Sequence, residues 1–240
     1  MFPFIFDWTF IILIPSMLLA LWAQAKVKGN LTKYSKVPTR RGMTGAQVAA
    51  QLLAEHGLRD VALERLPDNK PWADHYDPKA RAVRLSAHVY DSTSISAVSV
   101  AVHEVGHAVQ HSESYFPLAF RSGMFPIVRF GSGAAIPIIF IGIILGALGS
   151  VDAEIVRIIL NVGIIMFTAV VLFQLITLPV EFNASRRAMV MMEQGRYLSD
   201  DTEIRGARKV LSAAAMTYVA AATAAISQLI RLLIITSRHR

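Results

Sequence analysis

Residues 130–151, FGSGAAIPIIFIGIILGALGSV, and residues 158–180, IILNVGIIMFTAVVLFQLITLPV, are two apolar stretches without a charged residue. Each is long enough for the roughly 20 residues that a helix needs to cross a bilayer. Two further apolar stretches lie at residues 2–25, interrupted by Asp7, and at residues 210–230. The last is rich in alanine, which suits close helix packing in lipid but lowers its hydrophobicity. We therefore expect about four transmembrane helices, although the sequence leaves open whether the fourth spans or is buried among the others.

The overall composition agrees with a membrane protein. Hydrophobic residues make up 54% and charged residues 17% of the 240 residues, whereas a soluble domain has about 25% charged residues. The net charge of +7 is typical of basic loops held on the cytoplasmic side of a membrane. The basic residues do not form one aromatic-laced face, so we expect no nucleic-acid partner. The chain has no cysteine, which excludes disulfides, thiolate metal ligands and a cysteine nucleophile.

The distribution of charge predicts the membrane topology. Basic residues follow the first apolar stretch instead of preceding it, so residues 1–25 read as an uncleaved transmembrane anchor rather than a signal peptide. The positive-inside rule then places residues 26–125 and residues 181–209 in the cytoplasm. Residues 126–180 form a transmembrane hairpin between them. Residues 210–240 form a C-terminal transmembrane or buried helix with a basic tail.

The first cytoplasmic segment has the pattern of a small α+β unit, over residues 42–115. Thr44 can cap a helix that ends near His56, where Gly57 suits a left-handed C-terminal turn. The fold class we expect is therefore a mainly α membrane protein that carries a small cytoplasmic α+β unit.

Three more elements follow in this unit. Residues 61–66 and 81–85 alternate weakly between polar and apolar, which predicts two short strands. Residues 74–78, DHYDP, have turn chemistry and predict a loop between the strands. A second helix is expected to begin at Ser94 or Ser96 and to run through His111.

The sequence His103-Glu104-Val105-Gly106-His107 lies on this second helix and matches the HExxH pattern. Histidines at positions i and i+4 share one face of a helix, so both imidazoles can reach one zinc ion. The glutamate serves in this motif as the general base that activates water. A carboxylate in such an apolar stretch is costly to bury unless a cation compensates it. The pattern therefore predicts a zinc site with His103 and His107 as ligands and Glu104 as the catalytic base, which makes the small cytoplasmic α+β unit a zincin-like metalloprotease unit.

A catalytic zinc site needs a third protein ligand. His111 adds another i+4 step, but it lies about 12 Å along the helix axis from His103, so the two cannot share one ion. It is better explained as a residue behind a ligand or at the rim of the site. Glu181 directly follows the second uncharged apolar stretch and returns to the cytoplasmic face, which makes it the best candidate. The acids set aside lie across the membrane, too far along the helix, or in a stretch that looks solvated: Asp152, Glu154, Glu113, Glu193, Asp200, Asp201 and Glu203.

HEVGH, two apolar stretches and then EFNASRRA together resemble the neutral zinc metallopeptidase family of bacterial membrane proteins, often called YugP-like. The resemblance covers nearly the whole chain and includes DHYDPKARAVRLS and LPVEFNASRRA. The layout is also similar to that of HtpX-type membrane metalloproteases, in which two spans separate HExxH from a glutamate ligand. The resemblance implies Zn²⁺ held by His103, His107 and Glu181, and a bacterial plasma membrane. Four residues after the glutamate, HtpX-type enzymes carry Asp and this chain has Ser185, so Asn183 and Ser185 remain alternatives for the group behind a ligand histidine.

The expected function is hydrolysis of peptide bonds in membrane-associated or misfolded proteins at the cytoplasmic face. Candidate donors to the transition state are His75, Tyr76 and Arg186, and the strand at residues 81–85 could bind an extended peptide through its edge. Expected partners are therefore a protein or peptide substrate and the lipid bilayer, with a homo-oligomer or other membrane proteins left open. An intramembrane protease of the site-two type lacks support, because the chain has no LDG-type motif. The alternative from another class is a zinc-stabilised scaffold or chaperone subunit without catalysis.

Overall fold

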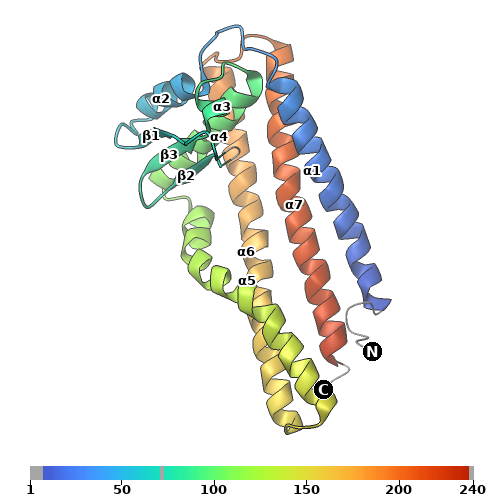
Figure 1. The fold of residues 1–240 in the computed structure, drawn as a ribbon. Coiled ribbons are helices and arrows are strands. Elements are labelled where there is room, and N and C mark those ends of the chain that lie inside the picture. Colours follow the sequence, from blue (N-terminus) through green and yellow to red (C-terminus); the bar gives the residue numbers. More distant parts are fainter. Residues whose placement is uncertain (1–7, 71–72, 238–240) are drawn as a thin grey trace. The chain divides into compact units, whose positions relative to one another are not determined.

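The computed structural model describes residues 8–70 and 73–237, and within these ranges it is mainly helical (Figure 1). Four of the described helices are long and apolar enough to cross a membrane. This confirms a mainly α membrane protein and includes the fourth apolar stretch among the candidate spans. Asp7 and the basic tail at residues 238–240 lie outside the described residues. The four candidate spans are Trp8–Tyr34, which joins the 3-10 helix η1 (Trp8–Leu13) to α1 (Ile14–Tyr34), then α5 (Phe116–Leu148), α6 (Ala153–Gln194) and α7 (Asp201–Ser237).

The chain divides into two compact units. The first comprises Met1–Trp22, Phe120–Leu178 and Tyr218–Arg240. Its core is formed by apolar side chains of α5, α6 and α7, namely Ala135, Ile139, Ile143, Val156, Leu160, Phe167, Val171, Leu232 and Ile235. Many of its other large apolar side chains are exposed, as expected for helices whose outer faces meet lipid.

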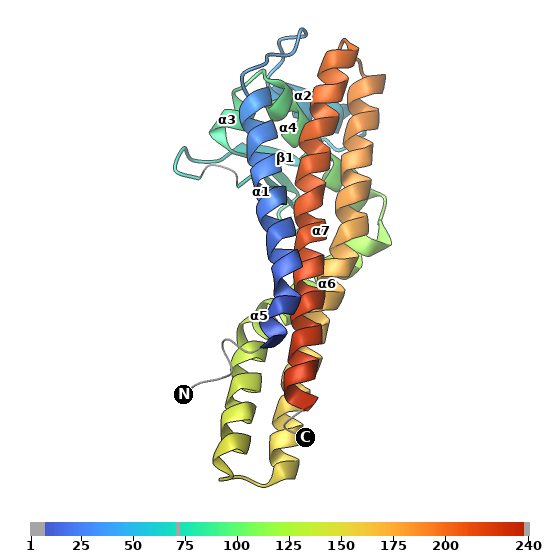
Figure 2. The ribbon, with the colours of Figure 1, turned by 90° about the vertical axis from the view of Figure 1, so that its right-hand side faces the viewer.

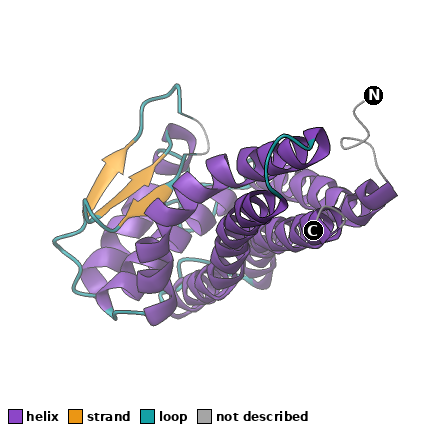
Figure 3. Ribbon diagram, turned by 90° about the horizontal axis from the view of Figure 1, so that it is seen from below, coloured by secondary structure: helices purple, strands orange, loops and turns teal. Residues whose placement is uncertain are grey.

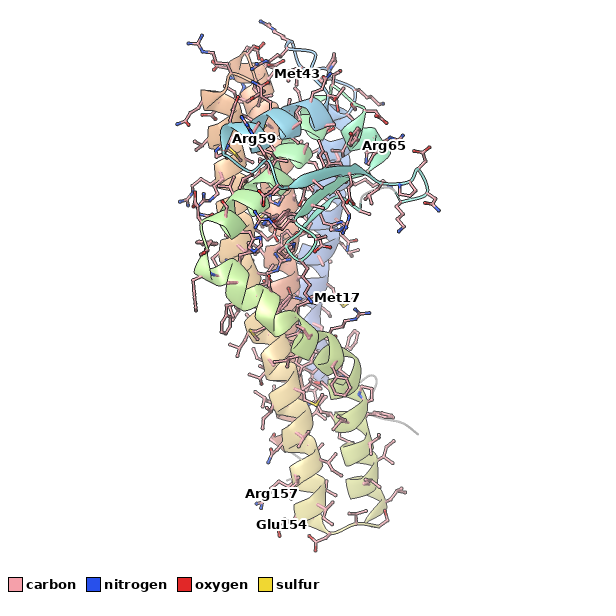
Figure 4. All side chains as sticks on the ribbon, turned by 90° about the vertical axis from the view of Figure 1, so that its left-hand side faces the viewer. Met17, Met43, Arg59, Arg65, Glu154 and Arg157 are labelled. Carbon is pink, nitrogen blue, oxygen red and sulfur yellow. The ribbon has the colours of Figure 1, made fainter. Side chains whose placement is uncertain are left out.

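Small residues let the helices of this first unit approach closely, as is common in membranes. A Cβ at Gly163 of α6 would lie 2.4 Å from a side-chain atom of Ile139 on α5. At the turn between α5 and α6, the labelled Glu154 and Arg157 lie together on the first turns of α6 (Figure 4). On α7, the guanidinium of Arg231 lies 5.7 Å from the ring centroid of Phe10.

The second unit comprises Ala23–Ala119 and Pro179–Thr217. It holds three shorter helices, α2 (Gly45–Glu55), α3 (Ala87–Tyr90) and α4 (Ile95–Ser112), and a small sheet. The ends of α1, α6 and α7 that belong to this unit share its core. Within the unit α1 and α7 lie side by side (Figure 2), and the Asn30 side chain donates a hydrogen bond to the carbonyl of Lys209.

The start and end of α2 follow from its sequence. The Thr44 hydroxyl accepts the N–H of Gln47, and the Gln47 side chain accepts the N–H of Thr44. This reciprocal pair satisfies two N–H groups that a helix start leaves unpaired. Gly57 has φ +73°, in the left-handed region. The predicted cap and the predicted C-terminal turn are both confirmed.

The sheet has three strands in the order β1-β3-β2, labelled in Figure 1 and coloured orange in Figure 3. Strands β1 (Ala62–Arg65) and β3 (Ala82–Leu85) confirm the two predicted strands and pair in parallel. The predicted loop at residues 74–78 is wrong for its centre, because β2 (His75–Asp77) pairs antiparallel with β3. The expectation that residues 81–85 offer a free edge is also wrong, because β3 is the central strand and both its edges are paired. The edge strand next to it is β2.

Not all of the acids after residue 193 are solvated, contrary to the prediction from the sequence. The sequence places Glu203 in a solvated stretch, but its side chain is buried. Its carboxylate accepts the main-chain N–H of Arg40 at 2.6 Å and that of Ser199. The basic segment after α1 is thereby tied to the start of α7, and Arg41 adds a contact with the Tyr197 ring, 4.5 Å from its centroid.

Candidate active site

Helix α4 presents the HEVGH residues on a well-anchored, mostly buried helix. The Ser94 hydroxyl caps its start by accepting the N–H of Ala97, which confirms the first of the two predicted starting residues. The helix runs through His111 as predicted. The rings of His103 and His107 meet edge to face, with centroids 4.7 Å apart. The spacing of four residues therefore places both imidazoles on one face, as predicted.

Glu181 completes a group of three possible metal ligands. Its Oε2 lies 3.2 Å from Nε2 of His103 and 3.6 Å from Nε2 of His107. The three ligand atoms lie within 4.8 Å of one another, and the Glu181 side chain is only 2% exposed. Ligands placed about 2.0–2.2 Å from a tetrahedral zinc lie roughly 3.3–3.6 Å from each other. The separations of 3.2 and 3.6 Å are close to this range and suit a zinc ion, and so does the donor set of two imidazoles and one carboxylate.

The charge at this group favours a cation. Glu104 and Glu181 are both buried beside the two imidazoles. Burial opposes charge on His107, but the hydrogen bond to Glu181 and the charges of Glu104 and Glu181 outweigh it, so the pKa of His107 lies above its ordinary value. Negative charge held in a buried site is stabilised by a positive partner, whether a proton or a metal ion.

The two segments that carry the ligands come together at a glycine. A Cβ at Gly106 of α4 would lie 2.9 Å from the carbonyl oxygen of Ala184 on α6. No larger residue fits this contact without movement of the backbone. Gly106 of the HEVGH motif therefore allows α4 to approach the turn of α6 that carries Glu181.

Each histidine is held by a second contact on its Nδ1 atom. The Ser185 hydroxyl lies 3.3 Å from Nδ1 of His103, and the Gln110 side-chain oxygen lies 2.9 Å from Nδ1 of His107. The Asn183 side-chain oxygen accepts a hydrogen bond of 2.9 Å from Gln110. Sequence reasoning named Ser185 and Asn183 and missed Gln110. The sequence contained a signal for Gln110, because it lies three residues after His107 and residues three apart on a helix occupy neighbouring positions of one face.

Glu104 is held by the edge strand. The main-chain N–H of Tyr76, on β2, donates a hydrogen bond of 2.9 Å to Glu104 Oε2. The Tyr76 hydroxyl lies 2.8 Å from Nδ1 of His111, so His111 contacts this strand and is not among the three possible ligands. The β2–β3 turn is fixed by Asp77, whose pKa lies below its ordinary value because its carboxylate accepts the N–H of Ala80 and pairs with Arg84.

The remaining candidates make other contacts or are exposed. The ring of His75 contacts the carbonyl of Ala73, and the side chain of Arg186 is exposed. Glu113 pairs with Arg187 at 2.7 Å, so the acid set aside on grounds of helix geometry has an arginine partner. Asp152 and Glu154 belong to the first unit, where the Asp152 carboxylate accepts the N–H of Glu154.

Comparison with known proteins identifies the family of this chain. A family model described as "Putative neutral zinc metallopeptidase" matches residues 9–237. The chain belongs to this family. A Bacillus subtilis (strain 168) protein named "Putative membrane protease YugP" is 51% identical over 217 residues, which cover 90% of this chain and 91% of that protein. No solved structure matches the chain. Membership of this zinc metallopeptidase family and the four apolar helices establish a membrane protein related to metalloproteases, and the predicted resemblance is confirmed.

Proposed function

We propose that this protein is a membrane-embedded zinc metalloendopeptidase in which His103, His107 and Glu181 hold the metal and Glu104 is the general base. The observation that carries the proposal is the separation of the two Nε2 atoms from Glu181 Oε2, at 3.2 and 3.6 Å. Three protein ligands leave one position of a tetrahedral zinc for water and substrate, which distinguishes a catalytic from a structural site.

When bound, zinc supplies Lewis-acid polarisation of the scissile carbonyl and makes the attacking water more acidic. Glu104 accepts the proton of that water and passes it to the leaving amine. The hydrogen bond from the Tyr76 N–H holds one carboxylate oxygen of Glu104, so the other oxygen can transfer the proton from a fixed position. Glu104 is therefore placed to act as a general base, a role that a structural zinc site does not need.

The substrate-binding edge belongs to β2 in this proposal, because β3 is paired on both sides. Glu104 already accepts the outward N–H of Tyr76, so an extended peptide paired with the remaining main-chain groups of the β2 edge would pass directly beside Glu104. Main-chain pairing of this kind binds peptides with little dependence on their sequence. The Tyr76 hydroxyl, fixed beside His111 on α4, is the donor that we propose for the transition state, in preference to His75 and Arg186.

We further propose a multi-pass protein of the bacterial plasma membrane with this site on the cytoplasmic side. The substrates would be membrane-associated or misfolded proteins. The basic residues that follow α1 and those between Glu181 and α7 support this orientation through the positive-inside rule. Single cysteines introduced into the cysteine-free sequence would test this orientation. In intact cells, a membrane-impermeant reagent should label only cysteines on the outer side of the membrane.

The deciding experiment compares wild type, Glu104→Gln and Glu181→Ala for zinc content and for cleavage of an unfolded membrane protein in detergent. Glu104→Gln should keep zinc and lose cleavage, and Glu181→Ala should lose both. If the protein is a non-catalytic scaffold, zinc should stabilise the wild type, and the wild type should show no chelator-sensitive cleavage. Normal cleavage by Glu104→Gln would show that another group is the base.

A further inference from the structure

The side chain of Gln110 is completely buried, with 0% exposure, on α4 one turn beyond His107. It makes three hydrogen bonds of 2.9 Å each. Its oxygen contacts Nδ1 of His107, and its nitrogen donates to the carbonyl of Val180 and to the side-chain oxygen of Asn183. A primary amide has two N–H donors, and both have acceptors here. A buried amide with its donors and acceptor engaged is strongly fixed in orientation.

The orientation of this amide determines the tautomer of His107. A backbone carbonyl only accepts hydrogen bonds, so the amide nitrogen must face Val180 and the amide oxygen must face His107. An amide oxygen also only accepts, so the proton of neutral His107 lies on Nδ1. The lone pair then lies on Nε2, which is the atom that faces Glu181 at 3.6 Å. Gln110 therefore presents the correct nitrogen to a metal.

The same side chain also fixes the position of the third ligand. Val180 directly precedes Glu181, and Asn183 lies two residues after it on α6. The two hydrogen bonds that the Gln110 nitrogen donates thus hold α6 on both sides of Glu181. Asn183 is held in turn by the Arg187 side chain at 2.7 Å, and Arg187 pairs with Glu113. One amide connects a ligand histidine on α4 to the helical turn that carries Glu181.

We infer that Gln110 is a positioning residue for the metal site, with the two tasks of setting the tautomer of His107 and holding Glu181 opposite it. The inference rests on the proposed function, because it takes His107 and Glu181 as zinc ligands. Glutamine suits both tasks because it offers an acceptor and two donors at one end. A glutamate could accept from His107 but could not donate to Val180, and a methionine of similar length could do neither.

The test compares Gln110→Met and Gln110→Glu with wild type in the full-length protein in detergent. Zinc affinity is measured by competition with a chelator, and the visible spectrum of the Co²⁺-substituted protein reports the ligand geometry. Groups that orient zinc ligands change metal affinity by about 10–100-fold when removed. We expect Gln110→Met to bind zinc 10–100-fold more weakly with an altered Co²⁺ spectrum, and Gln110→Glu, which keeps the bond to His107, to lie between Gln110→Met and wild type.

The control is Gln51→Met on α2, where an exposed glutamine bonds the Glu55 side chain. It should leave zinc affinity and the Co²⁺ spectrum unchanged. A purely structural role for Gln110 would lower the melting temperature of the metal-free protein without moving either metal readout, and that result would overturn the inference. If Gln110→Glu binds zinc as weakly as Gln110→Met, Gln110 does not act by setting the tautomer of His107.

One measurement needs no folded variant at position 110. Long-range ¹H–¹⁵N spectra of ¹⁵N-histidine-labelled wild type distinguish the two tautomers, and comparison with His107→Gln assigns the signal. In the zinc-loaded protein we expect the single ring proton of His107 on Nδ1, and a proton on Nε2 would contradict the inference. If wild type itself binds no zinc against the chelator, the proposed function fails. If wild type binds zinc and the Gln110 variants match it, only this inference fails.

Discussion

Gly106→Ala tests how closely α4 and α6 must approach for the site to form. The added Cβ would lie 2.9 Å from the Ala184 carbonyl oxygen, whereas ordinary contact begins at 3.4 Å. The obstructing atom is backbone, so it cannot turn aside as a flexible side chain does. The two helices must therefore separate locally by about 0.5 Å, a distance over which van der Waals energy changes steeply.

Two opposing effects decide the stability of this variant. Replacing glycine by alanine inside a helix stabilises by about 0.5–1 kcal/mol, because glycine loses more conformational freedom on folding. Over-packing a tight contact costs about 1–3 kcal/mol. We expect Gly106→Ala to lower the free energy of unfolding by about 1–2 kcal/mol. Gly29 on α1 is the matched control, because a Cβ there meets nothing within 4 Å, and Gly29→Ala should stabilise by up to about 1 kcal/mol.

The site adds a second readout to the comparison. Because Gly106 lies between His103 and His107, a shift of α4 away from α6 moves both imidazoles away from Glu181. Zinc affinity should fall about tenfold or more, which is the lower range for disturbing groups that hold zinc ligands. Chelator competition and denaturant unfolding in one detergent would measure both effects. The reasoning is refuted if Gly106→Ala is as stable as Gly29→Ala and binds zinc as tightly as wild type.

Three further variants test separate parts of the structure. Tyr76→Phe should lower kcat by about 10²–10³-fold with zinc content unchanged, because it removes the proposed transition-state donor; an unchanged kcat in peptide-cleavage assays would assign that role elsewhere. Thr44→Ala should cost about 1 kcal/mol in thermal unfolding through loss of the α2 cap, and Thr44→Ser, which keeps the hydroxyl, should restore most of it. The pKa of Asp77 is lower in the folded than in the unfolded state, so its stabilising contribution is present above the unfolded pKa and is lost as the pH falls through the folded one. Wild type should therefore lose melting temperature more steeply than Asp77→Asn below about pH 4, and equal slopes would show that the Asp77 contacts are not stabilising.

The sequence predicted those features that local chemistry determines. Thr44 and Ser94 are capping residues at the starts of amphipathic stretches, and Gly57 provides the left-handed turn, so the helix boundaries followed directly. The histidine pair and Glu104 followed from spacing on one helix. Glu181 followed from its place after an apolar stretch, although its meeting with the histidines depends on the tertiary fold.

The features that the sequence did not predict depend on contacts between distant segments. Strand β2 has three residues, and its extended conformation is stabilised by pairing with β3 rather than by its own DHYDP sequence. The central position of β3 could not be seen from two weakly alternating segments. Glu203 stands in a charged stretch, yet it is buried because main-chain N–H groups from two segments converge on it. Gln110 has no local signal beyond its place one turn from His107.

The contacts of Gln110 have a consequence for how this site can change during evolution. Its bond to Val180 uses the backbone carbonyl, so position 180 can exchange one apolar residue for another without losing that bond. Its bonds to His107 and Asn183 join side chain to side chain, so a substitution at position 110 or 183 requires a compensating change at the other. Among relatives, positions 110 and 183 should therefore vary together, while position 180 drifts independently of both.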